Sequence, residues 1–343
     1  MNNKIIKTFI LVTLLVLLVG LASATEVSTD TTSTPITLDA SSDTSSTDTT
    51  PTVAEDTVPT TTDTVQESVT SKQTDKKEIS KEEKNKKTAA PINVGNFTDL
   101  QSAFDSSDTI VTVNITANIT LTESLSTSIT YLTIEGNGFT INGSNQHQFL
   151  NIDKRCTVTI NNLTITNCYA QSGGAIYNSG TLTITDTNLT HNTATGQNNN
   201  GLGGAIYNNG GTLNITHSNL THNTATGQQN GRGGAIFNYG TSSNLTILNS
   251  NLTQNTATGQ NGYGGAIYNA YGANLNITQS NLTQNKATGQ EEGYGGAIYN
   301  TYGANLNITQ SNLTHNTATG QGQDGWGFGG AIYNAYGNLN INN

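Results

Sequence analysis

One short motif recurs along the second half of this chain at a nearly constant interval. The tract Gly-Gly-Ala-Ile-Tyr-Asn, or a near copy of it, occurs six times, and successive copies begin 30, 30, 31, 31 and 34 residues apart. The copies begin at Gly173, Gly203, Gly233, Gly264, Gly295 and Gly329. Self-similarity with a period of about 20 to 50 residues is typical of solenoids, in which each repeat buries its apolar face against its neighbours. The motif therefore predicts a stack of similar coils.

Within each repeat, apolar and polar residues alternate over short runs. In the run Leu-Asn-Ile-Thr at 275–278, the aliphatic side chains face one way, and Asn and Thr face the other. Gly, Asn and Ser separate three such runs, around Ile267, at Leu275 and Ile277, and at Leu282. This pattern predicts an all-β chain, a parallel β-helix (β-solenoid) with three short strands per coil. Because parallel crossover connections are overwhelmingly right-handed, we expect right-handed winding.

A secretory signal peptide is predicted over residues 1–24. Lys4 and Lys7 precede an apolar run that is followed by Ala-Ser-Ala, a cleavage site. A membrane anchor is the alternative, but the run of about 13 residues is shorter than the roughly 20 that a spanning helix needs. Residues 25–91 are rich in Ser, Thr and Asp and then in Lys and Glu, and this composition cannot offset chain entropy by burial. We expect a secreted chain, held at the cell surface or envelope, with a disordered linker that serves as a stalk.

A cap is predicted at the start of the folded part. The run Asn96 to Phe104 has apolar residues at helical spacing, and Thr98 with Gln101 fits a capping box. A short helix there would cover the first coil, which would otherwise expose unpaired strand groups. Alternation that begins at Ile110 predicts two or three degenerate coils before the regular ones. The expected segments are the signal peptide (1–24), the linker (25–91), the cap with degenerate coils (92–155) and the regular coils (156–343).

The charge of the chain is acidic and unevenly distributed. Thirteen basic and 23 acidic residues give a formal net charge of −10 and a pI near 4.8, which argues against nucleic acid as a partner. From Cys156 to Asn343 the charged side chains are Asp186, Arg232, Lys286, Glu291, Glu292 and Asp324.

This scarcity of carboxylates argues against catalysis. Glycoside hydrolysis needs a carboxylate pair that flanks the scissile bond, and a lyase needs a base with acidic metal ligands. Glu291 and Glu292 are adjacent in a predicted loop and absent from the sister repeats. We therefore expect no enzyme, no catalytic residue, no cofactor and no metal. One acidic site stays open as an alternative, near Glu123, Glu135, Asp153, Lys154 and Arg155.

Histidine recurs at one repeat position. His191, His222 and His315 occupy it in three copies, and Gln254 and Gln284 occupy it in the other two. A metal ligand should not exchange with Gln so freely, which leaves only adventitious metal binding by His191 and His222 in adjacent coils.

Cys156 and Cys168 are the only cysteines. Export permits a disulfide between them. They are 12 residues apart within one coil, and bridging needs Cα atoms within about 7 Å. They either form a disulfide or fill core space.

A second tract, Leu-Thr-Xaa-Asn, follows the first in each full repeat. Its copies lie at 189–192, 220–223, 252–255, 282–285 and 313–316. The two motifs together resemble the repeat of polymorphic outer-membrane (Pmp) proteins, which pair GGAI with FxxN, although Leu replaces Phe here in every copy. With the Ser/Thr-rich stalk, the chain looks most like adhesin-like surface proteins of methanogenic archaea. That resemblance covers about half the chain and implies a pectate-lyase-like right-handed β-helix with a role in adhesion.

Alternation assigns whole columns of side chains to one side of the coil wall. If Ile267 points inward, Ala266 and Tyr268 point outward, and Asn269 returns inward. The asparagine column is then expected to form an internal structural ladder of amide hydrogen bonds. Its members are Asn178, Asn208, Asn238, Asn269, Asn300 and Asn334.

The aromatic column is expected on the outside. Such a stripe either stabilises neighbouring coils by ring stacking or binds sugar rings or a partner surface. The candidate binding residues are Tyr177, Tyr207, Phe237, Tyr268, Tyr299 and Tyr333, joined by Tyr271 and Tyr302. Further rings at Tyr239 and Tyr336 extend this stripe, and Tyr263, Tyr294 and Trp326 join it from predicted loops.

Fourteen Asn-Xaa-Ser/Thr sequons, from Asn96 to Asn312, invite N-glycosylation of an exported protein. The alternating pattern itself generates many of them. Glycans on every rung of a column with a spacing of about 4.8 Å would collide, so we expect partial occupancy.

These features predict an exported, adhesin-like surface protein that binds cells or envelope or host polysaccharides without catalysis. The expected partner is a polysaccharide or a surface protein of another cell. A carbohydrate-active β-helix enzyme is the first alternative, and it would need carboxylates clustered on one face. A purely structural surface-layer protein or a water-ordering protein is the second, suggested by columns such as Thr183, Asn214, Thr246 and Asn276.

The last coil also carries an expectation. No strand equivalent to 312–314 follows Ile341 before Asn343, so the coil would expose unpaired backbone groups. We expect end-to-end self-association of the solenoid, or a longer parent chain.

Overall fold

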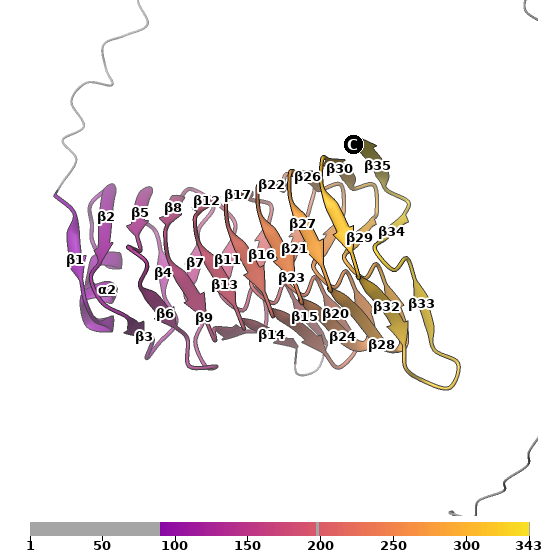
Figure 1. Cartoon of the computed structure of the whole chain (residues 1–343). Helices are drawn as coiled ribbons and strands as arrows, with labels where there is room; N and C mark the ends of the chain where they lie inside the picture. The colour runs from indigo at the N-terminus through magenta and orange to yellow at the C-terminus, as the bar shows by residue number, and fades with distance from the viewer. Residues whose placement is uncertain (1–89, 197–198, 343) are drawn as a thin grey trace, which may run out of the picture. The chain divides into compact units, whose positions relative to one another are not determined.

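The structure is a computed structural model that describes residues 90–196 and 199–342. The predicted signal peptide and nearly all of the predicted linker lie outside these residues. Within the described part, the chain is a parallel β-solenoid with one helix, as the repeat predicts (Figure 1). None of the helical structure in the described part is long and apolar enough to cross a bilayer.

The strands with the Leu-Xaa-Ile alternation stack into one ten-stranded sheet, sheet A. Neighbouring strands are parallel and in register, so that Leu275 pairs with Leu306 and Ile277 with Ile308. These side chains are buried, and the Asn between them is exposed. Sheet A contains β1 (Ile92–Val94), β2 (Ile110–Ile115), β5 (Tyr131–Glu135), β8 (Thr157–Asn161), β12 (Thr181–Thr185), β17 (Thr212–Thr216), β22 (Asn244–Leu248), β26 (Asn274–Thr278), β30 (Asn305–Thr309) and β35 (Asn338–Asn342).

The other two predicted strands of each repeat form two eight-stranded parallel sheets. Sheet B carries the Leu of the Leu-Thr-Xaa-Asn tract, and sheet C carries the Ile of the Gly-Gly-Ala-Ile tract. Sheet B contains β3 (Ile119–Thr120), β6 (Thr140–Asn142), β9 (Thr164–Thr166), β13 (Asn188–Thr190), β18 (Asn219–Thr221), β23 (Asn251–Thr253), β27 (Asn281–Thr283) and β31 (Asn312–Thr314). Sheet C contains β4 (Ser126–Thr127), β7 (Leu150–Ile152), β11 (Ile176–Asn178), β16 (Ile206–Asn209), β21 (Ile236–Tyr239), β25 (Ile267–Ala270), β29 (Ile298–Thr301) and β34 (Ile332–Ala335).

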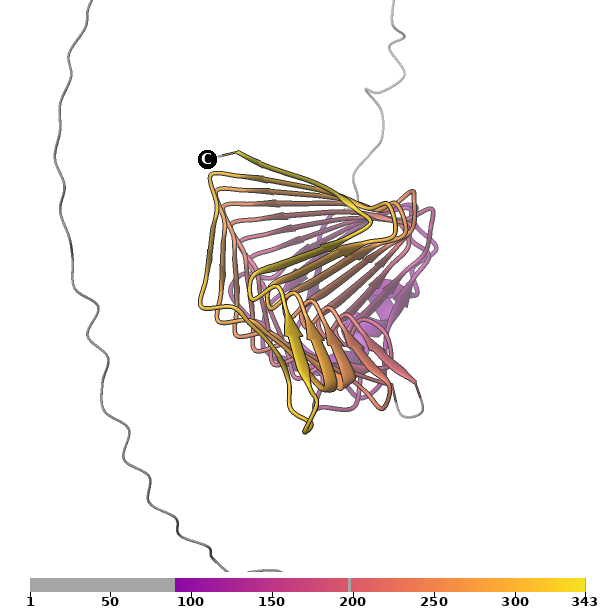
Figure 2. The same cartoon turned by 90° about the vertical axis from the view of Figure 1, so that its right-hand side faces the viewer.

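The coils wind with the predicted right hand around one core. Figure 2 looks along the solenoid from its C-terminal end, and the chain turns counterclockwise as it approaches the viewer. Aliphatic side chains of sheets A, B and C meet inside the tube, and Leu275, Leu282 and Ile267 are all fully buried. The predicted inward face is therefore the core.

A fourth sheet, sheet D, is formed by segments that the sequence predicted to be loops. It adds to the three predicted strands in the coils from β10 onward, because equivalent segments of successive coils pair in parallel and so satisfy their backbone groups. Glu291 and Glu292, predicted in a loop, accordingly lie within a strand. Sheet D contains β10 (Tyr169–Ala170), β14 (Thr193–Gly196), β15 (Asn200–Leu202), β19 (Thr224–Gly227), β20 (Asn230–Arg232), β24 (Thr256–Tyr263), β28 (Lys286–Tyr294), β32 (Thr317–Gly320) and β33 (Trp326–Phe328).

From β14 onward, each coil contributes to sheet D an outgoing and a returning segment, which together we call the arm. The two segments pack closely, because a Cβ on Gly262 of the returning segment would lie only 2.6 Å from the carbonyl oxygen of Ala257. Glycine permits that approach. The returning segment then carries the side chain of Tyr263 back over sheet C.

The predicted cap is helix α2 (Phe97–Phe104), but its N-cap is Asn96 and not Thr98. Oδ1 of Asn96 accepts the backbone N–H of Asp99 at 2.9 Å, and its Nδ2 donates to the Asp99 carboxylate at 2.8 Å. Asparagine is a stronger N-cap than threonine, and this reciprocal pair satisfies the first turn. The helix buries Leu100 against the first coil.

The asparagines of sheet C form one continuous ladder, which is buried from Asn178 to Asn300. In each step, Nδ2 of one side chain donates to Oδ1 of the next at 2.7 to 2.8 Å. Nδ2 of Asn269 also lies 3.2 Å from the carbonyl oxygen of Ala273 and 3.0 Å from that of Asn305. The ladder therefore satisfies buried carbonyl groups where the chain turns from sheet C into sheet A. Its rungs are Asn178, Asn208, Asn238, Asn269, Asn300 and Asn334.

A second ladder runs along the asparagines of the Leu-Thr-Xaa-Asn tract. Each Oδ1 accepts both the backbone N–H and the Nδ2 of the preceding rung at 3.0 to 3.1 Å. Its rungs are Asn192, Asn223, Asn255, Asn285 and Asn316.

The two cysteines are free and buried, so they fill core space and form no disulfide. Cys168 occupies the position that precedes the second ladder, and its backbone N–H donates to Oδ1 of Asn192 at 2.9 Å. Burial raises the pKa of the Cys168 thiol to about 12.

We expect Asn269→Ala to lower the free energy of unfolding by about 2 to 3 kcal/mol, since it leaves buried carbonyl groups without a donor. Chemical denaturation followed by circular dichroism measures the change. Asn281→Ala is the control, because Asn281 belongs to an exposed ladder, and its loss should cost less than about 0.5 kcal/mol. Equal losses in the two variants would contradict a structural role for the internal ladder.

Candidate functional site

The aromatic column that the sequence placed on the outside is buried over its central coils. The side chains of Tyr207, Phe237 and Tyr268 are 9%, 2% and 3% exposed, and burial raises the pKa of both tyrosine hydroxyls. The prediction of an external stripe is wrong for these three, because the arms cover them. Ala266, also predicted to face outward, is fully buried.

The arms and sheet C meet in what we call the aromatic seam. Within sheet C, Phe237 stacks on Tyr207 and Tyr268 at centroid distances of 5.0 and 4.9 Å. From the arms, Tyr263 lies 5.3 Å from Tyr299, and the Arg232 guanidinium lies 5.8 Å from the Tyr268 ring centroid. These are stacking and cation–π contacts, so the seam fastens the arms to the tube. Tyr177, Tyr299 and Tyr333 are half-buried at its margins.

Three tyrosines remain exposed in a row at the corner between sheets C and A. Tyr271, Tyr302 and Tyr336 are 41%, 54% and 91% exposed, and we call them the tyrosine row. The rings of Tyr271 and Tyr302 stack at 4.6 Å with an interplanar angle of 16°. Tyr239 extends the row, since its ring lies 4.8 Å from that of Tyr271. Of the eight candidate binding residues, only Tyr271 and Tyr302 are strongly exposed.

The backbone of the tyrosine row is left-handed. Tyr271, Tyr302 and Tyr336 have φ of 59°, 51° and 60°, and each precedes a glycine at the turn. For a bulky residue this conformation costs roughly 1 to 2 kcal/mol, which Gly or Asn would avoid. A residue kept in a costly conformation at an exposed turn is a candidate for function.

The repeated histidine position lies at the corner that leads into sheet D. His191 and His222 stack in adjacent coils with ring centroids 4.9 Å apart and an interplanar angle of 3°. No group of three or more His, Cys, Asp or Glu side chains within 90–196 and 199–342 is arranged to hold a metal ion.

The two adjacent carboxylates of one arm, Glu291 and Glu292, are engaged with neighbouring polar side chains. Glu291 accepts a hydrogen bond from Nε2 of Gln260 at 2.7 Å, and Glu292 accepts one from the hydroxyl of Tyr294. In the first coils, Glu135 accepts from Nδ2 of Asn161 at 3.1 Å.

Comparisons of this chain with protein-family models, with curated proteins and with solved structures found no match. The candidate site therefore depends on geometry and sequence alone.

Proposed function

We propose that this chain is an exported, non-catalytic adhesin of the cell surface that binds a polysaccharide or a surface protein of another cell. The observation that carries this proposal is the tyrosine row. Its three rings are exposed on successive coils in a conformation that costs stability. Tyrosine supplies rigid contact area with a polar tip, and it is enriched where proteins bind partners.

The rest of the solenoid supports a binding role. Its coils repeat a rigid surface at intervals of about 4.8 Å, which suits a ligand that is itself a polymer. The predicted signal peptide and the resemblance to Pmp repeats point to export and to adhesion. The sparse carboxylates of the regular coils favour binding over a carbohydrate-active enzyme, which would need two of them across one bond.

The double variant Tyr271→Ser/Tyr302→Ser tests this proposal. We expect it to bind cells or polysaccharides at least about tenfold more weakly, because central tyrosines typically contribute more than 1 kcal/mol each to an interface. Its melting temperature should stay within a few degrees of that of the wild-type chain, since both side chains are exposed. Binding to a glycan array and to whole cells measures the effect.

The matched control is Asn276→Ser/Asn307→Ser, which changes two exposed side chains of the same two coils on sheet A. It should bind as the wild-type chain does. If the tyrosine variant bound as tightly as the wild-type chain, or if the control lost as much affinity, the tyrosine row would not be the binding surface.

A further inference from the structure

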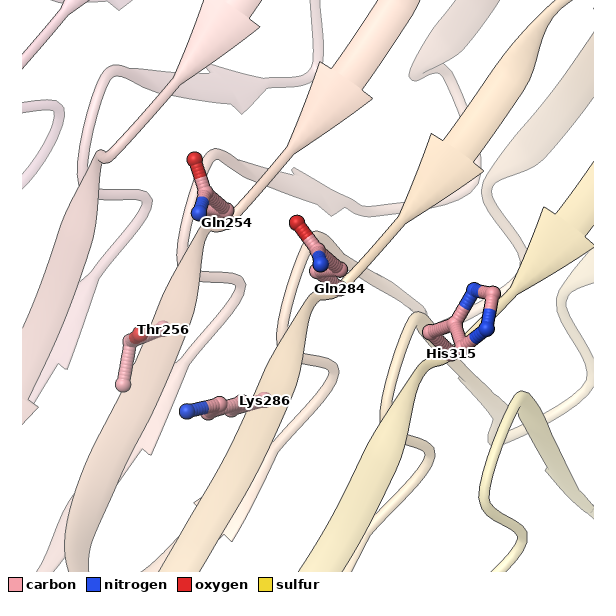
Figure 3. Close-up of a pocket in the computed structure, with 5 residues that line it drawn as sticks. All are labelled: Gln254, Thr256, Gln284, Lys286 and His315. Atoms are coloured by element: carbon pink, nitrogen blue, oxygen red, sulfur yellow. The ribbon is translucent and has the colours of Figure 1, made fainter.

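A polar hollow of about 330 Å³ lies away from the tyrosine row, where three coils turn from sheet B into sheet D. Gln254, Gln284 and His315 stand at equivalent left-handed corners, with φ of 57°, 57° and 54°. Thr256 and Lys286 open the next strands and complete the lining. Figure 3 shows the Lys286 side chain extending towards Thr256, below the two Gln amides.

One residue that lines the hollow, Lys286, differs from the residue at the equivalent position of the other repeats. Lys286 pairs in register with Thr256 on one side and Thr317 on the other. The same column carries Thr in the other four repeats, at Thr193, Thr224, Thr256 and Thr317. The fold therefore does not require a lysine there, and threonine has the higher strand propensity.

The side chains that line the hollow have no partners within the described part of the chain. The Lys286 ammonium group makes no ion pair or hydrogen bond there, and neither do the side chains of Gln254, Gln284 and His315. An ammonium group supplies three donors and a full charge, and each primary amide supplies both donors and an acceptor. Together they match a ligand that carries one anionic group and several hydroxyls.

We propose that this hollow binds a carboxylate-bearing sugar, a uronate unit of an acidic polysaccharide. Lys286 pairs with the carboxylate, and the amides of Gln254 and Gln284 hydrogen-bond the ring hydroxyls. His315 closes the side of the hollow at the next coil. The volume lies at the lower end of the range for small-ligand sites, about 300 to 1,000 Å³. One part of this inference rests on the proposed adhesin function, namely that the sugar belongs to a polysaccharide.

The test titrates the full chain with glucuronate, glucose and acetate and follows the imidazole signals by NMR. The chain has five histidines, and His315→Gln identifies the signal of the hollow because Gln already occupies the equivalent corners. We expect glucuronate to shift the His315 signal, and glucose and acetate to shift it at least about tenfold less at equal concentration. Lys286→Thr, which restores the residue of the sister repeats, should weaken glucuronate binding at least about tenfold.

Three results would overturn the inference: no shift with glucuronate, an equal shift with glucose or acetate, or unchanged binding by Lys286→Thr. The Tyr271→Ser/Tyr302→Ser variant should retain the glucuronate response. Failure of the whole chain to adhere to cells or polysaccharides would contradict the proposed function but would not change the result of this titration. The two proposals can therefore be refuted independently.

Discussion

Replacing Gly265 with alanine is expected to lower the free energy of unfolding by at least about 4 kcal/mol, in the range that only severe lesions reach. A Cβ at this position would lie 2.1 Å from the carbonyl oxygen of Gly296 and 2.5 Å from backbone atoms of Lys286. Both are backbone atoms fixed by the stack of coils, so neither can move aside. Denaturation followed by circular dichroism should show the loss, with a lower midpoint for the whole solenoid.

Gly303→Ala separates this steric effect from the general cost of replacing glycine. Gly303 has φ of 72°, and a Cβ there would meet nothing within 4 Å. We therefore expect a loss of only about 1 to 2 kcal/mol, from the left-handed conformation alone. If Gly265→Ala were as stable as Gly303→Ala, close packing against the next coil would not explain the second glycine of the repeat.

The two glycines of the repeated motif illustrate what the sequence could predict. Punctuation by glycine indicated a bend at this point. The structure gives each glycine its own reason. Gly264 adopts a left-handed φ of 62°, and Gly265 lies too close to the next coil for a Cβ. The contact between Gly265 and the next coil joins residues far apart in the sequence, so no local sequence pattern predicts it.

The columns of the tube were predictable because a fixed period forces identical residues into register. Asn269 pairs with Asn238 and with Asn300, and this register alone makes an amide ladder. The second ladder, at positions such as Asn255, follows from the same logic and required only that its motif be treated as a column.

Sheet D was not predictable in the same way. Its segments, such as β28, consist mostly of Gly and polar residues and show no sustained apolar alternation, so each resembles a loop when taken alone. They become strands because equivalent segments lie one coil above another and exchange backbone hydrogen bonds. Apolar–polar alternation along a strand predicts which side chains face the inside of the tube and which face outward. It does not predict that a further layer packs on the outer face.

Tyr268→Ala tests that outer layer directly. The ring is 3% exposed and stacks on Phe237 and Tyr299 at 4.9 and 5.1 Å, beneath the ring of Tyr263. Removing a buried aromatic ring leaves a cavity and costs about 3 to 5 kcal/mol. We expect a loss of that size in the free energy of unfolding, measured by denaturation.

Tyr302→Ala is the matched control, because it removes the same side chain from the next coil at a site that is 54% exposed. It forfeits one stacked pair with Tyr271, so its cost should be about 1 kcal/mol or less. If the aromatic column were external, both rings would be exposed to solvent, and the two variants would lose similar amounts of free energy of unfolding. A difference of several kcal/mol between them instead requires that the arm fold back over Tyr268, and it would divide the tyrosines into those that hold the solenoid together and those that are free to bind.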